Sequence, residues 1–191
     1  MHVDERVLAD LRRRYGEPAI MRWEGEVAEA EFRLATYAPG RTHDVTLYIF
    51  SGDRLALIRK PMYAPGIWRP PGGGIHEGEE FVAGATREAF EETGLEVELE
   101  RYLVATEATF TWADERVDWR THVFSARAVA SDTVSLSPRD AKEIEAARWG
   151  TLEELQGPIR KLVLNTGPAL WRYRAALHDA AAAALRRDDT L

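Results

Sequence analysis

The spacing of hydrophobic and polar residues changes along the chain, and each change marks an expected element. Near the start, Val3, Val7, Leu8 and Leu11 recur at helical spacing, and Gly16 follows them. Apolar residues three and four positions apart lie on one face of a helix. We therefore expect a short amphipathic helix that ends at Gly16.

Residues 19–37 form the next patterned segment, and we expect them to fold as a β-hairpin. Apolar and charged residues alternate in its second half, where the apolar positions are Ala28, Ala30, Phe32 and Leu34. A period of two is typical of a half-buried strand, and the Glu24-Gly25 pair suits the turn before it. Residues 38–44 (APGRTHD) are expected to link this hairpin to the main body.

The main body is expected to start with a tight hairpin. Two apolar runs, VTLYIF (residues 45–50) and LALIRK (residues 55–60), are separated by a short stretch beginning SGD, whose residues favour a turn. Residues 61–74 contain four prolines and four glycines, which exclude regular structure. Residues 80–93 have helix-forming composition and precede Gly94, so we expect a helix there.

The second half of the chain predicts another hairpin, a short strand and a final helix. Residues 95–130 are rich in Val, Leu, Thr and aromatics around a polar ADER, which indicates a long hairpin. A short strand is expected at residues 143–149, and Thr151 with Glu154 has the spacing of a capping box. Residues 169–186 carry a helical apolar stripe. This order of elements predicts an α+β or α/β sandwich with a mixed sheet.

Composition and charge limit the classes of function. The 191 residues suffice for one domain, and the formal net charge is −7. Binding to nucleic acid or to an anionic membrane depends on a basic surface, so neither partner is expected. The chain has no cysteine, so a metal would have to bind through oxygen or imidazole ligands. No segment predicts a signal peptide or a membrane span, and we expect a cytoplasmic protein.

Three glutamates crowd onto the helix expected at residues 80–93. On a helical wheel Glu88, Glu91 and Glu92 lie side by side, next to an apolar stripe. Like charges at this spacing cost roughly 0.2–0.5 kcal/mol per pair. Two explanations stay open: a solvated acidic face, or a site for Mg²⁺ or Mn²⁺, which prefer carboxylate oxygens.

The loop before this helix favours the metal site. Its sequence is PPGGG, and glycine lets a backbone approach a ligand closely in conformations that are barred to other residues. A loop carbonyl and the helix carboxylates could therefore meet at one cation. Such a cation would bind the phosphate oxygens of an anionic substrate and lower the pKa of an attacking water.

The loop and helix also share one spaced motif across 23 residues, namely Gly73, Glu79, Arg87, Glu88, Glu91, Glu92, Gly94 and Leu95. In this register the segment resembles the signature box of the Nudix hydrolase family, of the MutT-like type. The one departure is Ala89, which is smaller than the usual aliphatic residue. We expect one domain over residues 1–191. The resemblance implies a core at about 44–155, an N-terminal extension at 1–43 and a C-terminal helical extension at 156–191.

The resemblance implies a fold, a reaction and a metal site. The fold is an αβα sandwich with a mixed sheet, and the reaction is hydrolysis of a diphosphate bond in a nucleoside diphosphate derivative with Mg²⁺ or Mn²⁺. By position in the box, the implied metal ligands are Glu88, Glu92, Glu91 and the carbonyl of Gly72. The residues with an implied structural role, which includes an ion pair that orients loop and helix, are Gly73, Glu79 and Arg87.

Members of the family differ in their general base, so two sets of candidates stay open. Glu91 or Glu88 in the box is the first candidate. Glu143 and Glu145, just after the loop SLSPRD, are the alternative, although a solvated strand edge explains them as well. The base must lie within reach of the attacking water, and this geometry decides between them.

Substrate contacts are expected near the loop PMYAPGIW. Arg59, Lys60 and Arg69 flank it and are candidates for binding phosphate, although surface solubility explains each equally well. Three aromatic residues could stack on a nucleobase, but aromatics in sheets more often belong to the core: Tyr63, Trp112 and Trp119. The expected partner is a small phosphorylated molecule, and the leaving group stays open.

Two further hypotheses concern partners and catalysis. The hairpin expected at residues 19–37 looks long for a core that is complete without it, so we expect a homodimer through this segment. A catalytically inactive Nudix-like nucleotide-binding or regulatory domain is the alternative to an enzyme. It predicts broken carboxylates, whereas all three box glutamates are present.

Overall fold

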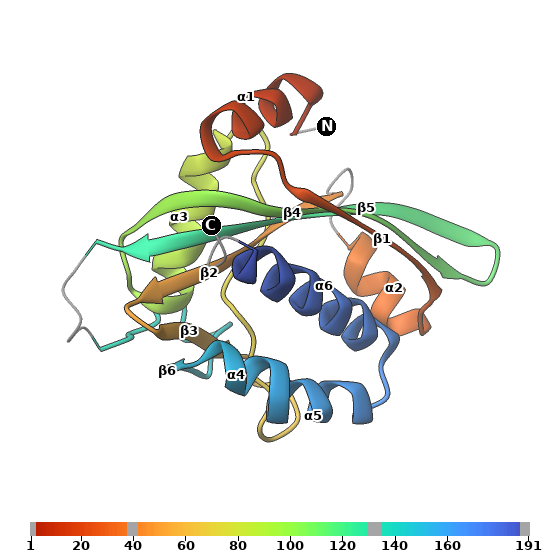
Figure 1. Ribbon diagram of the computed structural model, residues 1–191. Coiled ribbons are helices and arrows are strands. Elements are labelled where there is room, and N and C mark those ends of the chain that lie inside the picture. The colour runs from red at the N-terminus through yellow and green to blue at the C-terminus, as the bar shows by residue number, and fades with distance from the viewer. Residues whose placement is uncertain (1–2, 38–41, 130–134, 188–191) are drawn as a thin grey trace.

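The computed structural model describes residues 3–37, 42–129 and 135–187, with a six-stranded mixed sheet at its centre (Figure 1). Across the sheet the strands follow the order β1-β4-β5-β2-β3-β6. Their bounds are β1 Ala19–Glu26, β2 His43–Ser51, β3 Arg54–Arg59, β4 Val97–Trp112, β5 Glu115–Ala128 and β6 Ala146–Gly150. Strand β1 pairs in parallel with β4, and β2 pairs in parallel with β5. The other neighbouring strands are antiparallel.

Helices cover both faces of this sheet. Two of them, α1 (Glu5–Tyr15) and α3 (Phe81–Thr93), share a hydrophobic core with one face. The opposite face is covered by α2 (Glu29–Thr36), α4 (Leu152–Glu154), α5 (Arg160–Asn165) and α6 (Ala169–Arg186), with the π-helical turn η1 (Leu155–Ile159) between α4 and α5. This arrangement confirms the predicted αβα sandwich with a mixed sheet.

Local sequence sets the ends of α3, the helix that carries the crowded glutamates. At its start the Glu80 carboxylate accepts a hydrogen bond from the backbone N–H of Ala83 at 2.8 Å. At its end Gly94 adopts φ +76°, a left-handed conformation that glycine reaches without steric cost. The helix therefore lies where the composition and Gly94 predict it.

The N-terminal segment differs from the predicted hairpin. Strand β1 pairs with β4 instead of with a neighbouring hairpin strand, and α2 takes the place of the expected second strand. Gly25 lies inside β1, where a Cβ would approach the Trp23 ring to 2.5 Å, so this glycine makes room for an aromatic ring instead of forming a turn. Ala, Glu, Arg and Leu are good helix formers, and Glu31 accepts a hydrogen bond from the Ala28 N–H at the helix start. Helix propensity and this start signal outweighed the short period-two alternation.

Two other expectations of the N-terminal region depend on this result. The homodimer expected through the hairpin at residues 19–37 stays a prediction, but it loses the support of that hairpin. The linker expected at residues 38–44 lies mostly outside the described residues, and β2 already begins at His43. None of the helices in the described ranges combines the length and the apolar character needed to cross a membrane.

Most other predicted elements are confirmed. The hairpin at residues 45–60 forms β2 and β3, and the hairpin at 95–130 forms β4 and β5, with residue 130 outside the described residues. Helix α6 has the predicted bounds. The strand predicted at residues 143–149 begins three residues later, so Glu143 and Glu145 lie in the approach to β6 and not within it.

Buried polar contacts fasten α6 to the sheet. The Tyr173 hydroxyl donates a hydrogen bond to Thr121 at 2.7 Å and lies 3.0 Å from the Thr106 hydroxyl. The Tyr48 hydroxyl, in β2, lies 2.9 Å from His178 Nδ1. Because a buried polar group without a partner costs free energy, these contacts hold α6 in one position and rotation.

A second buried histidine lies on the other face of the sheet. His122 Nε2 is 2.9 Å from His43 Nδ1, and its other ring nitrogen is hydrogen-bonded to the Tyr102 hydroxyl. Burial lowers the pKa of His122 from 6.5 to about 3, and His43 contributes in the same direction. Burial likewise lowers the pKa of His178 from 6.5 to about 3. Both imidazoles are therefore neutral in the folded chain at neutral pH.

We expect the chain to lose stability as the pH falls below about 6.5. The unfolded chain protonates His122 and His178 near that pH, whereas the folded chain keeps both neutral down to about pH 3. The unfolded state thus binds more protons, and each histidine lowers the free energy of unfolding by about 1.4 kcal/mol per pH unit in this window. Urea unfolding at about pH 7.5, 6 and 5 measures this slope.

A matched variant isolates one of the two histidines. His178→Gln retains an amide oxygen that can accept a hydrogen bond from Tyr48, but it does not titrate. Its stability should depend less on pH, by about 1.4 kcal/mol per pH unit between pH 6 and 5. A slope equal to that of the natural sequence would contradict a neutral buried His178.

Candidate functional site

The glycine-rich loop runs along β2, and its backbone hydrogen bonds fix its path. The N–H groups of Val45 and Leu47 donate to the carbonyls of Gly73 and Pro71 at 2.8 and 2.9 Å. Gly72 has φ +144°, and a Cβ there would lie 2.1 Å from the Val45 carbonyl oxygen. Only glycine fits so close to β2, which explains the glycine just before the motif.

The next glycine leaves room for a carboxylate of α3. A Cβ at Gly73 would lie 2.3 Å from Glu88 Oε2. The loop backbone therefore passes directly beside the Glu88 carboxylate. In this way the loop between β3 and α3 brings peptide groups to the acidic side of the helix, as the sequence predicts.

The three crowded glutamates differ in burial. Ala85, Ala89 and Thr93 of α3 face the sheet. The exposed fraction of the side chain rises from 3% for Glu92 through 13% for Glu88 to 43% for Glu91. The acidic face is thus not uniformly solvated, and its inner glutamates must be neutralised by groups within the protein or by a bound cation.

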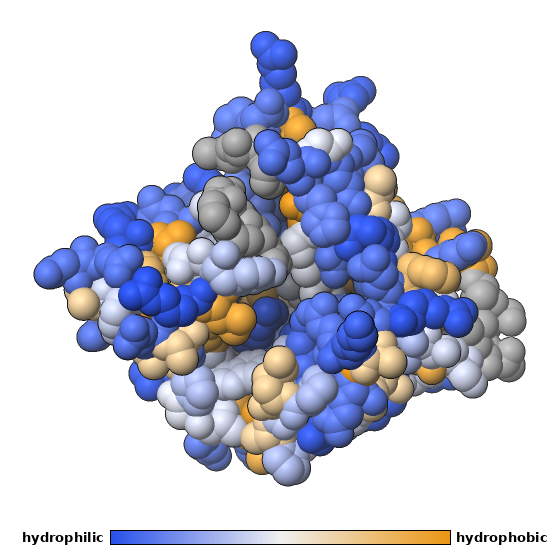
Figure 2. Space-filling view, turned by 180° about the vertical axis from the view of Figure 1, so that it is seen from behind, coloured by the Kyte–Doolittle hydropathy of each residue, from blue (hydrophilic) through white to orange (hydrophobic). Residues whose placement is uncertain are grey.

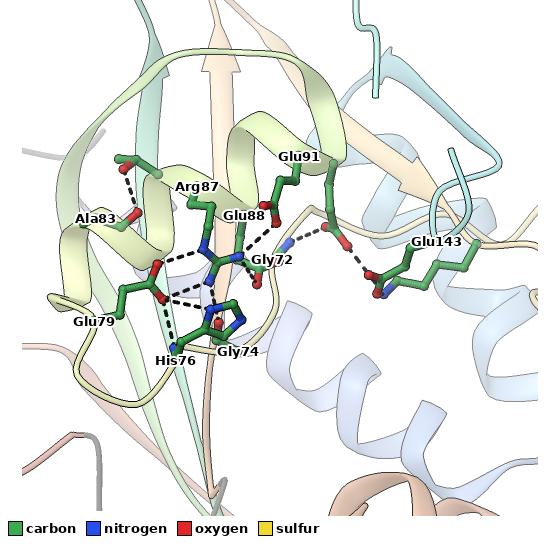
Figure 3. A network of polar contacts seen from close by, with 12 residues as sticks. Gly72, Gly74, His76, Glu79, Ala83, Arg87, Glu88, Glu91 and Glu143 are labelled. Carbon is green, nitrogen blue, oxygen red and sulfur yellow. Dashed lines mark hydrogen bonds and ion pairs between the residues drawn. The ribbon is translucent and has the colours of Figure 1, made fainter. Parts of the chain in front are cut away.

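Arg87 neutralises part of this charge (Figure 3). Its guanidinium binds both oxygens of Glu79, at 2.8 and 3.0 Å, and donates to the Gly74 carbonyl at 3.0 Å. Its Nη1 donates to Glu88 and to Glu91, both at 2.9 Å. Hydrogen bonds from Arg87 lower the pKa of Glu79 to about 2. The ion pair between Glu79 and Arg87 therefore ties the loop to the helix.

Glu88 remains short of positive charge. Burial raises its pKa to about 6, and the charges of Glu92 and Glu91 act in the same direction, against the opposing effect of Arg87. One guanidinium shared among three carboxylates does not fully compensate a buried one. The loop backbone beside Glu88 and the incompletely compensated charge of Glu88 both fit a hard divalent cation, which prefers carboxylate and carbonyl oxygens.

Glu92 has different partners from Glu88 and Glu91. Its Oε2 accepts a hydrogen bond from the Gly72 N–H at 2.6 Å, and its Oε1 lies 3.2 Å from Arg69 Nη2 and 3.5 Å from Lys60 Nζ. The sequence makes Arg69 a candidate for binding phosphate, with surface solubility as the other explanation. In the structure Arg69 is 2% exposed, so surface solubility does not explain it and its guanidinium is not presented at the surface.

The three glutamates are not arranged around one point. Within residues 3–37, 42–129 and 135–187, no group of three or more His, Asp or Glu side chains converges as a metal centre would require. The reason lies in the two arginines: Arg87 draws Glu88 and Glu91 together, whereas Arg69 draws Glu92 inward. The expected ligands are neighbours, but their side chains are occupied by partners within the chain.

The two loop glutamates pair with the cations at the end of β3. Arg59 Nε lies 2.9 Å from Glu145 Oε2, and the Glu145 N–H donates to the Arg59 carbonyl. Lys60 forms an ion pair with Glu143 and also approaches Glu92. Lys60 thus connects the box with the alternative base Glu143. Sequence spacing alone did not reveal this connection, because it depends on the pairing of β3 with β6.

The segment before Glu143 packs on the end of α3. The backbone N–H groups of Arg139 and Asp140 donate to the Glu91 carbonyl at 2.8 and 3.2 Å. An open hollow of about 620 Å³ lies beside them, lined by Glu91, Arg139, Asp140, Ala141 and Lys142. These contacts do not follow from the sequence, since turn residues predict a loop but not the surface on which it packs.

The aromatic candidates are engaged in internal contacts. Trp119 is 8% exposed and its indole N–H donates to Asp44 at 3.2 Å. Tyr63 accepts a hydrogen bond from Arg69 Nε at 2.8 Å, and Trp112 packs near Phe32. The structure therefore favours the core explanation for Trp119.

Figure 2 shows the face opposite α6, which is mostly hydrophilic and hollowed at its centre.

Comparisons with known proteins agree with this geometry. A family model described as NUDIX domain matches residues 40–170. Nudix hydrolase 25 of Arabidopsis thaliana is 37% identical over 57 residues, which cover 30% of this chain and 33% of that protein. The RNA pyrophosphohydrolase of Caulobacter vibrioides is 32% identical over 136 residues, covering 61% of this chain and 75% of that enzyme. The chain thus spans about a third of the length of the Arabidopsis relatives it matches.

A solved structure shares the fold. The MutT protein from Methanosarcina mazei Go1 matches with a TM-score of 0.51 at 23% identity, over 79% of this chain and 99% of that chain. The family model covers more than half of the chain, and it includes the whole loop and helix described above. The chain therefore belongs to the NUDIX domain family.

Proposed function

We propose that this chain is a metal-dependent hydrolase that cleaves a diphosphate bond in a nucleoside diphosphate derivative by attack of water. The Glu88 carboxylate carries the proposal, because it lies against the Gly73 backbone and its raised pKa of about 6 reflects buried negative charge that Arg87 compensates only in part. A relative is an RNA pyrophosphohydrolase and others are Nudix hydrolases, which supports hydrolysis of a pyrophosphate bond.

The residues around the loop would hold Mg²⁺ or Mn²⁺. We assign the ligands to Glu88, Glu91, Glu92 and the carbonyl of Gly72, which are hard oxygen donors. When bound, the cation would polarise phosphate oxygens and lower the pKa of water. Arg87 would keep Glu88 and Glu91 in place from the side, since its guanidinium already contacts both. Gly73 and Glu79 would keep the loop close to the helix.

The general base would come from the box. Glu91 is the most exposed of the three box glutamates, and burial raises the pKa of Glu88 to about 6. Either could accept a proton from water at the site. Glu143 and Glu145 remain the alternative, although each would first have to leave its ion pair with Lys60 or Arg59.

A small phosphorylated molecule is the proposed substrate. Arg59 and Lys60 lie at the end of β3, next to the box, and are the cations that we assign to phosphate contacts. The acidic net charge of −7 favours a small substrate over a long nucleic acid, whose binding depends on a basic surface. Arg69 would affect the substrate only through Glu92 and Gly72, because it is buried.

The competing function is a nucleotide-binding domain without catalysis. It would use the same loop and cations but would not require the glutamates. The glutamate set of the box is complete, and its internal ion pairs are formed. The two functions therefore differ in one measurable property, which is turnover.

Turnover is expected to require a divalent cation and Glu88. A panel of nucleoside triphosphates, nucleotide sugars and dinucleoside polyphosphates, incubated with Mg²⁺, Mn²⁺ or a chelator, should release nucleotide products only with metal. Glu88→Gln should lower kcat by more than about a hundredfold, beyond the loss typical of residues around a metal ligand. Chromatographic separation of the products measures both effects.

Glu98→Gln is the matched control, since Glu98 lies on an exposed part of β4 and pairs only with Arg127 among the contacts described. It should turn over like the natural sequence. Metal-independent turnover, or an unimpaired Glu88→Gln, would contradict the proposed mechanism. Binding of nucleotides without any product would favour the binding domain.

The two sets of candidate bases predict different kinetics. If Glu91 is the base, Glu91→Gln should lower kcat by about 10²–10⁴-fold, the usual contribution of a general base, whereas Glu143→Gln should lower it less than tenfold. Steady-state kinetics on one cleaved substrate measures both. The reverse order would assign the base to the loop.

A further inference from the structure

Arg69 is the most fully engaged buried cation near the site. It is 2% exposed, and all three of its guanidinium nitrogens donate hydrogen bonds. Nη1 donates to the carbonyls of Pro70 and Gly72 at 2.8 and 3.2 Å, and Nη2 donates to Glu92 at 3.2 Å. Nε donates to the Tyr63 hydroxyl at 2.8 Å. One side chain thus joins two parts of the loop between β3 and α3 to the helix α3.

Burying this charge is costly unless its partners are well placed. A buried ion pair repays its loss of hydration only with good geometry and additional hydrogen bonds. A simple salt bridge to Glu92 would not need the contact to Gly72. The guanidinium instead contacts two of the four groups assigned to the cation, the Gly72 carbonyl and the Glu92 carboxylate, and fixes them relative to each other.

Both groups retain capacity for a further ligand. A carbonyl oxygen has two lone pairs, and a carboxylate has about four acceptor sites. Gly72 accepts one hydrogen bond from Arg69, and Glu92 has contacts with Arg69, Lys60 and the Gly72 N–H. Arg69 therefore orients these oxygens without using up their capacity to bind a cation.

A line of contacts extends from Arg69 to the C-terminal helix. The ring of Tyr63 packs edge to face on Trp171 of α6, with ring centroids 4.9 Å apart. Helix α6 is itself held by Tyr173 and by His178. Nearly all of α6 lies beyond the residues that the family model matches. The position of the guanidinium thus depends on an element outside the matched region.

We propose that Arg69 is a positioning residue for the cation site, and that α6 supports it through Tyr63. The inference rests on the proposed function. Arg69 contacts the Gly72 carbonyl and the Glu92 carboxylate together, and so holds two of the four groups assigned to the cation in a fixed relation to each other. Lysine keeps the charge but lacks the planar fork with five donors, so it cannot make these contacts together.

The experiment measures Mn²⁺ binding directly, by the loss of the free-ion signal in electron paramagnetic resonance, on the full chain. Arg69→Lys retains the positive charge beside Glu92, so a change in affinity reports geometry. Its dissociation constant for Mn²⁺ should rise by roughly 10–100-fold, the range for residues that orient metal ligands. Tyr63→Phe keeps the ring contact with Trp171 and removes only the hydroxyl, so the constant should rise less, by roughly threefold to tenfold.

Arg148→Lys is the matched control. Arg148 also forms a partly buried ion pair, with both oxygens of Glu154, and it lies over the ring of Trp68, next to Arg69 in sequence. It has no contact with the glycine loop among those described. Arg148→Lys should bind Mn²⁺ with the affinity of the natural sequence. Thermal unfolding of all variants shows how much each change affects stability alone.

Affinity within twofold of the natural sequence in both Arg69→Lys and Tyr63→Phe would overturn the proposal. An equal loss in Arg148→Lys would also overturn it, because the effect would then follow general destabilisation. If Arg69→Lys does not fold, Tyr63→Phe decides alone. Failure of the natural sequence to bind Mn²⁺ would refute the proposed function itself, and that outcome is distinct because no variant is involved.

Discussion

Repulsion between carboxylates on one helix is the constraint on which the site depends. Two arginines, whose guanidinium groups keep their charge at any ordinary pH, offset this repulsion between the carboxylates. Arg87 lies among Glu79, Glu88 and Glu91, and Arg69 lies beside Glu92. Without these cations the inner carboxylates would not stay both charged and buried. Even with them Glu88 remains undercompensated, and burial raises its pKa to about 6.

Gly72 and Gly73 let the loop backbone lie directly beside the Glu88 carboxylate, whose negative charge is only partly compensated. The loop lies between β2 on one side and the Glu88 carboxylate on the other, and side chains at Gly72 and Gly73 would collide with these two neighbours. Backbone hydrogen bonds to Val45 and Leu47 then hold the loop in this narrow space. Rigid elements therefore present the oxygens, as a site with demanding geometry requires.

Much of the fold could be predicted because local signals agree with tertiary structure. The helix before Gly94, both hairpins of the main body and α6 follow from period, turn residues and caps. The N-terminal hairpin was wrong because four alternating positions are too few to separate a strand from a short helix. In the site, the residues of the motif could be named from spacing. The roles of Arg69 and Lys60 could not, since their contacts join segments that meet only through the pairing of β3 with β6 and the burial of the loop.

The parallel pairing of β2 with β5 has a consequence for the order of folding. The glycine loop takes its shape from β2, and β2 is held in the sheet by β5, with His43 opposite Arg120. Pairings between distant segments form slowly, because the entropy of the closed loop is lost before the contacts are gained. During synthesis the complete motif therefore leaves the ribosome well before its shape exists. A nascent chain that ends just after Leu95 carries every residue of the motif, but its glycine loop still lacks the strand pairing that shapes it.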